Sequence, residues 1–301
     1  MVNEATPNVA DNGRLELPPG VSEWHRFRRV FLSRGVVVFG MIIMVLFIFV
    51  AIFAPLIAPY DPYEPDLDNT LQNPSAAHWL GTDALGRDTL TRIIYGTRTS
   101  LEIGLIVVAF ACIIGITLGT LAGFYGGWTY IIIMRFVDAL MSFPMILLAL
   151  VIAALLGGGM KNVIIALSVA LMPGYARLMC GQVLSVKQND YILAARSMGA
   201  SNLRIMLRHV VLNCVSPIIV QITMMLGVTI LAEAGLSFLG IGITPPTAAW
   251  GNMVADAQQY LLVLPILSFA PGLALMLVVF AFNMVGDGLR DALDPRLRGI
   301  L

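Results

Sequence analysis

The residue types that carry most enzyme chemistry are few in this chain and stand far apart. Its two lysines, Lys161 and Lys187, lie outside any Gly-x-x-x-x-Gly-Lys-Ser/Thr loop, so the sequence encodes no phosphate cradle of the Walker type. The three cysteines lie in or beside apolar runs and match no metal-binding or redox spacing: Cys112, Cys180 and Cys214. The three histidines have no metal-ligand or nucleophile partner at a meaningful spacing: His25, His78 and His209. We therefore predict no catalytic residue, no metal site and no cofactor in this chain.

The composition is typical of a membrane protein. Hydrophobic residues make up 58% of the 301 residues and charged residues 12%, against about half and about a quarter in a soluble domain. The formal net charge is zero, which gives no indication of nucleic-acid binding. Apolar runs long enough to cross a bilayer lie at 35–60, 103–134, 137–156, 163–178, 210–232 and 261–285, and the glycine-rich stretch 123–128 ends the second. We predict an all-α polytopic membrane protein with six transmembrane helices.

The basic residues assign the topology of these spans. With both termini in the cytoplasm, 14 of the 18 Lys and Arg residues fall on the cytoplasmic side, and the inverted topology would reverse that split. The expected parts are a cytoplasmic tail (1–34), a first span (35–60), an outer loop (61–99), a core of five spans (100–286) and a cytoplasmic tail (287–301). In the outer loop, Gly81 favours a turn and Asp83 can cap a helix, so we expect a short amphipathic helix on the outer membrane surface.

One polar, arginine-bearing segment interrupts the apolar chain between the fourth and fifth spans. It reads DYILAARSMGASNLRIMLRHVVLN, residues 190–213, within a cytoplasmic loop 179–209. Asn189 or Asp190 can cap a helix of about two turns, and Gly199 suits the left-handed conformation that ends one. Ser201 can cap a second helix, which begins at Asn202 and continues into the fifth span.

Two turns of helix are too few to be stable alone in water, so this helix needs a surface to dock against. Tyr191, Ala194, Ala195 and Met198 recur at helical spacing, and their small members permit close approach. This pattern favours a helix inserted into a partner's groove. On spacing alone, a solvated loop whose arginines only enforce topology explains the segment equally well.

The same segment resembles the cytoplasmic signature of ATP-binding-cassette (ABC) importer permeases, whose pattern is Glu-Ala-Ala, three residues, Gly, and later Ile-x-Leu-Pro. Ala194, Ala195 and Gly199 match this pattern, whereas Leu193 stands in place of the Glu and Leu212 in place of the Pro. Three further stretches are similar to the C-type permease of the dipeptide/oligopeptide/nickel subfamily: HWLGTDALGRDTLTRIIYGTRTSL, AGLSFLGIGITPPTAAWGNM and AFNMVGDGLRDALDPRLRG. Four motifs in order make the resemblance specific and extend it over almost the whole chain.

The resemblance implies a type I ABC importer permease that pairs with a second permease to enclose a path. It implies two cytoplasmic ATPase subunits, which bind ATP and Mg²⁺, and an extracytoplasmic solute-binding protein that delivers the substrate. The implied ATPase-coupling interface consists of nine residues: Asp190, Tyr191, Ala194, Ala195, Arg196, Met198, Gly199, Ala200 and Ser201. Residues from Asn202 onward would act as a continuous rod that carries motion into the fifth span. Peptides are the expected cargo, with nickel chelates, glutathione and sugars as alternatives.

Two acidic positions near or within the spans are candidates for the path or its gate. Asp138 is three residues from Arg135, and we expect a structural ion pair between them rather than a substrate contact, with Pro144 kinking the same span. Glu233, Ser237 and Phe238 lie at the outer end of the fifth span, where we expect a gate or a surface for the binding protein. A packed outer loop explains the second group equally well.

Two other classes of function were weighed. A secondary transporter would need ionisable residues near the bilayer midplane and an internally repeated architecture, and the six spans offer neither. An intramembrane enzyme would need a nucleophile–base or metal constellation, which the sequence lacks.

Overall fold

The computed structural model describes residues 23–293, and helices dominate that part of the chain. The elements are α1 (Glu23–Leu32), α2 (Gly35–Ile57), η1 (Leu67–Asn69), α3 (Thr89–Tyr125), α4 (Gly127–Met141), α5 (Met145–Leu156), α6 (Met160–Val186), α7 (Asp190–Ser197), α8 (Asn202–Arg204), η2 (Ile205–Val210), η3 (Val211–Cys214), α9 (Val215–Phe238), α10 (Trp250–Ala257), η4 (Gln258–Tyr260) and α11 (Ile266–Leu293). Residues 1–22 and 294–301, which belong to the predicted tails 1–34 and 287–301, lie outside the described residues.

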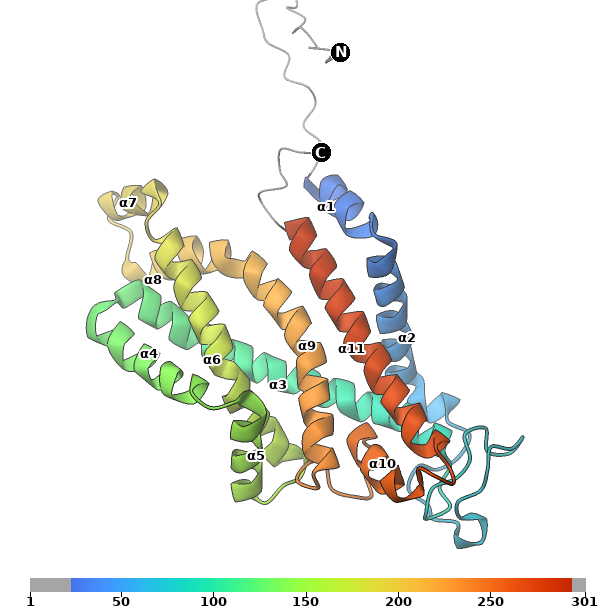
Figure 1. Ribbon diagram of the computed structural model, residues 1–301. Helices are drawn as coiled ribbons and strands as arrows, with labels where there is room; N and C mark the ends of the chain where they lie inside the picture. Colours follow the sequence, from blue (N-terminus) through green and yellow to red (C-terminus); the bar gives the residue numbers. More distant parts are fainter. Residues whose placement is uncertain (1–22, 294–301) are drawn as a thin grey trace, which may run out of the picture.

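Helices long and apolar enough to cross a membrane confirm the predicted class. Five qualify within the described chain: α2, α3, α6, the helical stretch Asn202–Phe238 and α11. The pair α4 and α5 qualifies as a sixth span if its two bent halves are counted together. In Figure 1, α1, α7 and the end of α11 lie at one end of the bundle, and α10 lies at the other. The distribution of basic residues assigns the α7 end to the cytoplasm.

The third span differs from its prediction. It begins at Gly127 rather than near residue 137, and it consists of two helices that meet at 90°. Pro144 stands at the break, as the residue before α5, with φ −55° and ψ 131°. Because proline has no N–H and disfavours helical backbone in the residue before it, the expected kink becomes a complete interruption.

The outer loop also differs from its prediction. The short 3-10 turn η1 is the one helical element in residues 61–88, and α3 begins only at Thr89, from where it runs unbroken for 37 residues. The cap is Asp88, whose carboxylate accepts a hydrogen bond from the Thr91 N–H at 2.8 Å. Asp83 is not a helix cap, because its carboxylate accepts from the backbone of Leu85 and Arg87 inside a turn.

The core is built on the contact of α3 with α6. Three glycines of α3 are spaced four residues apart and face α6: Gly115, Gly119 and Gly123. A Cβ at Gly119 would stand 2.4 Å from the carbonyl oxygen of Ala176, so only glycine allows the two backbones this close. Small residues at every fourth position are the usual way for membrane helices to pack tightly. Figure 1 shows α3 crossing the bundle behind α6 and α9, while α9 packs on α11 and α11 packs on α2.

Candidate functional site

The candidate coupling helix is α7, at the cytoplasmic end of the bundle (Figure 1). Asn189 precedes it in extended conformation, without a side-chain cap. The helix stops at Gly199, whose φ of +81° is the left-handed conformation that the sequence predicts. Closing hydrogen bonds run from the Gly199 N–H to the Arg196 carbonyl at 2.9 Å and from the Ala200 N–H to the Ala195 carbonyl at 3.1 Å.

The two faces of α7 are not those that the spacing predicts. Ile192 and Ala195 are buried against the chain itself, with exposures of 1% and 5%. Ala195 therefore belongs to the inward face, and Ile192 is a structural anchor that the sequence analysis missed. The outward face carries Tyr191, Leu193, Ala194 and Met198, and Leu193 and Met198 are 66% and 81% exposed. An apolar face exposed on the aqueous side indicates a surface that another protein covers.

The helical stretch after Gly199 is less regular than a continuous rod. Ser201 caps α8 as predicted, since its Oγ accepts from the Arg204 N–H at 3.4 Å. The winding then becomes a π-helix over η2 and a 3-10 helix over η3 before α9 begins at Val215. Leu212, where the resemblance would place proline, lies in the 3-10 turn. Such changes of winding within a helix often mark functional hinges, so the segment between α7 and α9 is a candidate hinge.

A charged side chain ties the other end of α7 to the core. Lys187 follows α6 directly, and its Nζ donates a hydrogen bond to the Phe124 carbonyl oxygen near the end of α3. The same ammonium lies 5.8 Å from the centroid of the Phe124 ring. Sequence spacing does not predict this contact, because 63 residues separate the two partners.

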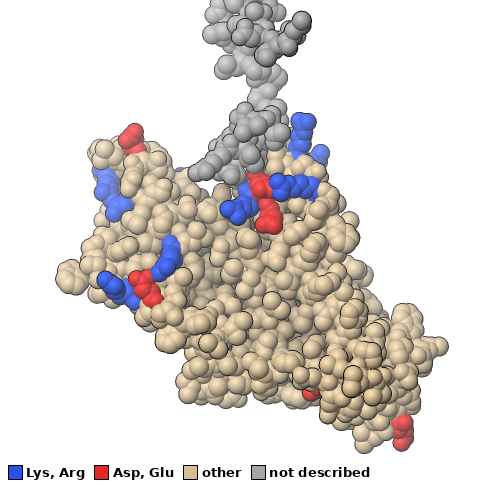
Figure 2. Space-filling model, in the orientation of Figure 1, with Lys and Arg blue, Asp and Glu red and all other residues tan. Residues whose placement is uncertain are grey.

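The ion pair of Asp138 also differs from the expectation. Its carboxylate pairs with Arg177 on α6, and not with Arg135. About half of each side chain is exposed, at 47% for Asp138 and 50% for Arg177. In Figure 2 acidic and basic side chains stand together on the flank of the molecule below the α7 end.

Glu233 lies inside the subunit rather than on its surface. It is 0% exposed, and its Oε1 accepts from Ser237 Oγ at 2.7 Å while its Oε2 lies 3.5 Å from Ser100 Oγ. Ser237 Oγ in turn accepts from the Ile243 N–H at 3.1 Å, which fixes the backbone that follows α9. Phe238 is the exposed member of the predicted group, at 41%.

Comparisons with known proteins agree with this geometry. Residues 115–299 match the family of binding-protein-dependent transport system inner membrane components, and residues 22–74 match the N-terminal transmembrane domain of oligopeptide transport permease C. The chain belongs to this permease family. It is 44% identical to the dipeptide transport system permease protein DppC of Alkalihalophilus pseudofirmus, over 92% of this chain and 91% of that protein. It is 46% identical to the glutathione transport system permease protein GsiD of Pectobacterium atrosepticum, over 91% and 92%.

A solved structure shares the fold. An inward-facing structure of the MetNI methionine ABC transporter aligns with 67% of this chain and 96% of its own, at a TM-score of 0.56 and 19% identity. This likeness supports the fold alone. Together with the family match, it makes the chain a multi-pass cell-membrane permease of an ABC importer, as the sequence motifs indicate.

The structure separates the predicted site residues of this permease into three groups. The residues predicted to form the ATPase-coupling interface lie together on α7 and the turn that follows it, with Ala195 facing inward. Asp138 lies on the flank of α4, and Glu233 with Ser237 lies in the interior near the opposite end. Among residues 23–293, no group of three or more His, Cys, Asp or Glu side chains is placed to hold a metal ion.

Proposed function

We propose that this permease pairs with a second, related permease and conducts peptides across the cell membrane. Support for the cargo comes from the relatives, whose names specify a dipeptide and glutathione, itself a peptide. The chain would be the non-catalytic subunit: two partner ATPases would bind ATP and Mg²⁺, and an extracytoplasmic binding protein would deliver the peptide.

The observation that carries the proposal is the division of α7 into two apolar faces. Ile192 and Ala195 anchor the helix to its own subunit, whereas Leu193 and Met198 project apolar side chains away from it. A helix of eight residues held only from one side is poorly stable, so a second surface must hold it from the other. We assign that surface to an ATPase subunit, whose closure on ATP would push α7 and the hinge of η2 and η3 behind it.

A docking test follows from the exposed face. The substitution Met198→Asp places a charge in the proposed contact and leaves the inward face of α7 intact. We expect the ATPase subunits to be lost from the purified complex and uptake to fall at least tenfold. Leu32→Asp is the matched control, because Leu32 is 42% exposed on α1 at the same end of the bundle. If Met198→Asp retains its ATPases and transports like the parent, α7 is not the coupling helix.

The cargo is tested separately by competition. Uptake of a labelled dipeptide into proteoliposomes that hold the whole transporter would be challenged with unlabelled dipeptide, glutathione, a nickel chelate and a sugar. Strong competition by dipeptide supports the peptide proposal. Selective competition by glutathione, a tripeptide with a γ-linked bond, would assign the chain to the second group of relatives, and competition by a chelate or sugar alone would overturn the proposal.

A further inference from the structure

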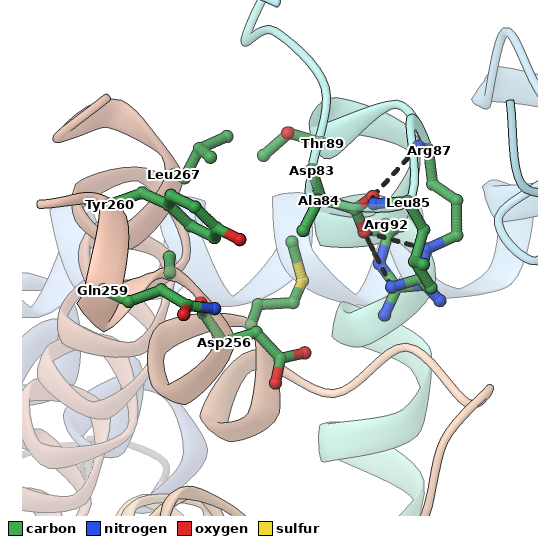
Figure 3. A pocket seen from close by; sticks show the side chains of 12 residues that line it. Asp83, Ala84, Leu85, Arg87, Thr89, Arg92, Asp256, Gln259, Tyr260 and Leu267 are labelled. Atoms are coloured by element: carbon green, nitrogen blue, oxygen red, sulfur yellow. Dashed lines mark hydrogen bonds and ion pairs between the residues drawn. The ribbon is translucent and has the colours of Figure 1, made fainter. Parts of the chain in front are cut away.

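A cavity of about 240 Å³ opens at the outer end of the molecule, where two distant parts of the chain meet (Figure 3). One wall comes from the outer loop and the start of α3, and includes Asp83, Arg87, Thr89 and Arg92. The other wall comes from α10, η4 and the start of α11, and includes Asp256 and Tyr260. The α10 helix that lines it lies at the end of the bundle opposite α7, which is the extracytoplasmic side (Figure 1).

Arg87 and Arg92 of the first wall are held by contacts with Asp83 and with the backbone of the outer loop. Asp83 Oδ2 accepts from Arg87 Nε at 2.8 Å and lies 2.7 Å from Arg87 Nη2 and 3.5 Å from Arg92 Nε. Arg92 Nη1 donates to the Pro62 carbonyl oxygen at 2.9 Å. Both arginine side chains are almost fully buried, at 8% and 4% exposure. Their charges oppose a cation in the cavity, and Asp83, which contacts both guanidinium groups, offsets part of that field.

The cavity also contains oxygen atoms that can accept hydrogen bonds from a ligand: the Asp256 carboxylate and the hydroxyls of Thr89 and Tyr260. Asp256 lies at the rim near the end of α10, and its carboxylate has no hydrogen bond or ion pair with any described residue. Partial burial raises the pKa of Asp256, while Arg92 and Arg87 lower it. Thr89 is 1% exposed, lines the same cavity, and its Oγ1 has no partner in the described part of the chain. In Figure 3 the Tyr260 hydroxyl and the Asp256 carboxylate point toward the space between the two walls.

From these contacts we propose that the cavity is a socket for a protonated primary amine, and specifically for a lysine side chain of the extracytoplasmic binding protein. An ammonium group has three donors, which suit one carboxylate and two hydroxyl oxygens. The C-terminal end of α10 adds partial negative charge beside Asp256. A lysine stem can lie along the apolar residues of the cavity, Met253, Ala257 and Leu267. This inference rests on the proposed function, because it assumes that a binding protein docks at the outer face.

The first experiment measures the concentration of binding protein that gives half-maximal stimulation of ATP hydrolysis by the complete reconstituted transporter. For Asp256→Asn we expect that concentration to rise at least about tenfold, because a partly buried charge pair loses one member. Tyr260→Phe should raise it by a smaller factor, and this variant keeps the ring and its packing. Asp68→Asn is the matched control, since Asp68 is an exposed acid of the outer loop that does not line this cavity.

A second experiment identifies the amine directly. A zero-length carbodiimide reagent joins a carboxylate to an adjacent lysine, and peptide mass spectrometry of the docked complex should find Asp256 linked to a lysine of the binding protein. Acetylating the binding protein's lysines should weaken docking to the parent but not to Asp256→Asn. The same variants would be assayed with an N-acetylated dipeptide, and a parent-only preference for the free amine would assign the socket to the substrate instead.

The outcomes distinguish the two proposals. If the binding protein fails to stimulate the parent transporter at all, the proposed function fails. If the parent is stimulated and Asp256→Asn and Tyr260→Phe respond at the parent's concentration without a crosslink at Asp256, the cavity holds only water and the socket is refuted.

Discussion

The Nζ of Lys187 donates a hydrogen bond to the carbonyl oxygen of Phe124 at 2.6 Å, and this contact joins the end of α6 to the end of α3. Only Gln188 and Asn189 separate Lys187 from α7. On its N-terminal side α7 is therefore attached to the α3–α6 core, and on its C-terminal side it continues into the irregular winding of η2 and η3. If an ATPase docks on α7, its movement would be transmitted both to the α3–α6 core and, through η2 and η3, to α9.

Lys187→Met should loosen the first attachment while keeping most of the side-chain volume. A charge-assisted hydrogen bond of this kind contributes roughly 1.5–3 kcal/mol, so we expect the number of peptides moved per ATP to fall several-fold, with a smaller change in ATP hydrolysis. Uptake and ATP turnover measured in the same proteoliposomes check this ratio. Lys161→Met is the control, because Lys161 is the other lysine of the chain and lies at the opposite end of α6. An unchanged ratio of uptake to ATP turnover for Lys187→Met would show that the contact takes no part in coupling.

The pair of Asp138 with Arg177 leads to a second prediction. Charged groups within spans are costly toward lipid and almost always face a protein interior or water. Since both side chains are half exposed in the isolated subunit, we expect the partner permease or the aqueous path to cover them. Asp138→Asn and Arg177→Gln should each lower uptake, and the double variant should be little worse than either one, because each single change already breaks the pair.

A double-mutant cycle on uptake rates and on thermal stability of the complex measures this coupling. Arg135→Gln is the control, since Arg135 is exposed on α4 near Asp138 but is not its partner. Strict additivity of the two single changes, or a larger loss with Arg135→Gln, would contradict the assignment.

The Lys187–Phe124 and Asp138–Arg177 contacts are tertiary contacts, which sequence spacing does not predict. The spans, the left-handed Gly199 and the Ser201 cap are local consequences of composition and backbone preference, so the sequence predicts them. Arg177 lies 39 residues from Asp138, and Arg135 was preferred only because it was near in sequence. Ala195 faces inward because of what α7 packs against. In a helix of eight residues, periodicity alone does not specify which face is buried.

The outer region was mispredicted for a related reason. Asp83 is a suitable cap by residue type and predicts a helix that begins there, but Asp88 is equally suitable by residue type. In the structure, Asp83 is instead occupied by two arginines and two backbone N–H groups, and Asp88 caps α3. The helix therefore begins after Asp88, and the residues expected in a separate surface helix form the first part of α3.

Asp256 leads to a pH prediction. Its pKa in the folded protein is raised, mainly by burial, and the charged groups that face it are Arg92, Arg87 and Asp83. A folded carboxyl with a raised pKa holds its proton more tightly than the unfolded one. The associated stability is therefore present below the unfolded pKa and is lost as the pH rises through the folded pKa. Asp256→Asn removes this loss.

We therefore expect Asp256→Asn to raise the apparent melting temperature of the purified protein at neutral pH, and the gain to shrink as the pH falls toward 4. Thermal unfolding of parent and variant across this range measures the difference. Asp68→Asn, in the same outer region, should show no such pH-dependent gain. A variant that is less stable than the parent at neutral pH would show that the Asp256 carboxylate is stabilised by its neighbours, contrary to this expectation.

Substitutions of Glu233 test whether its carboxyl group is part of the packed interior or of a gate. Ser237 donates to one oxygen at 2.7 Å, and Ser100 Oγ lies 3.5 Å from the other. In Glu233→Gln, the amide oxygen can still accept from Ser237 and the amide nitrogen can donate to Ser100. Glu233→Ala leaves the Ser237 hydroxyl without its acceptor and opens a cavity in a site that is 0% exposed.

We expect Glu233→Gln to unfold within a few degrees of the parent and to transport at a similar rate, and Glu233→Ala to lose roughly 2–5 kcal/mol of stability. Thermal unfolding and peptide uptake of both variants check this. Glu102→Ala is the control, an exposed acid on the neighbouring α3. If Glu233→Gln abolishes uptake while its stability stays at the parent's level, the carboxyl group takes part in transport itself. The hydrogen-bond network that joins α9 to Ile243 would then belong to the outer gate rather than to a fixed support.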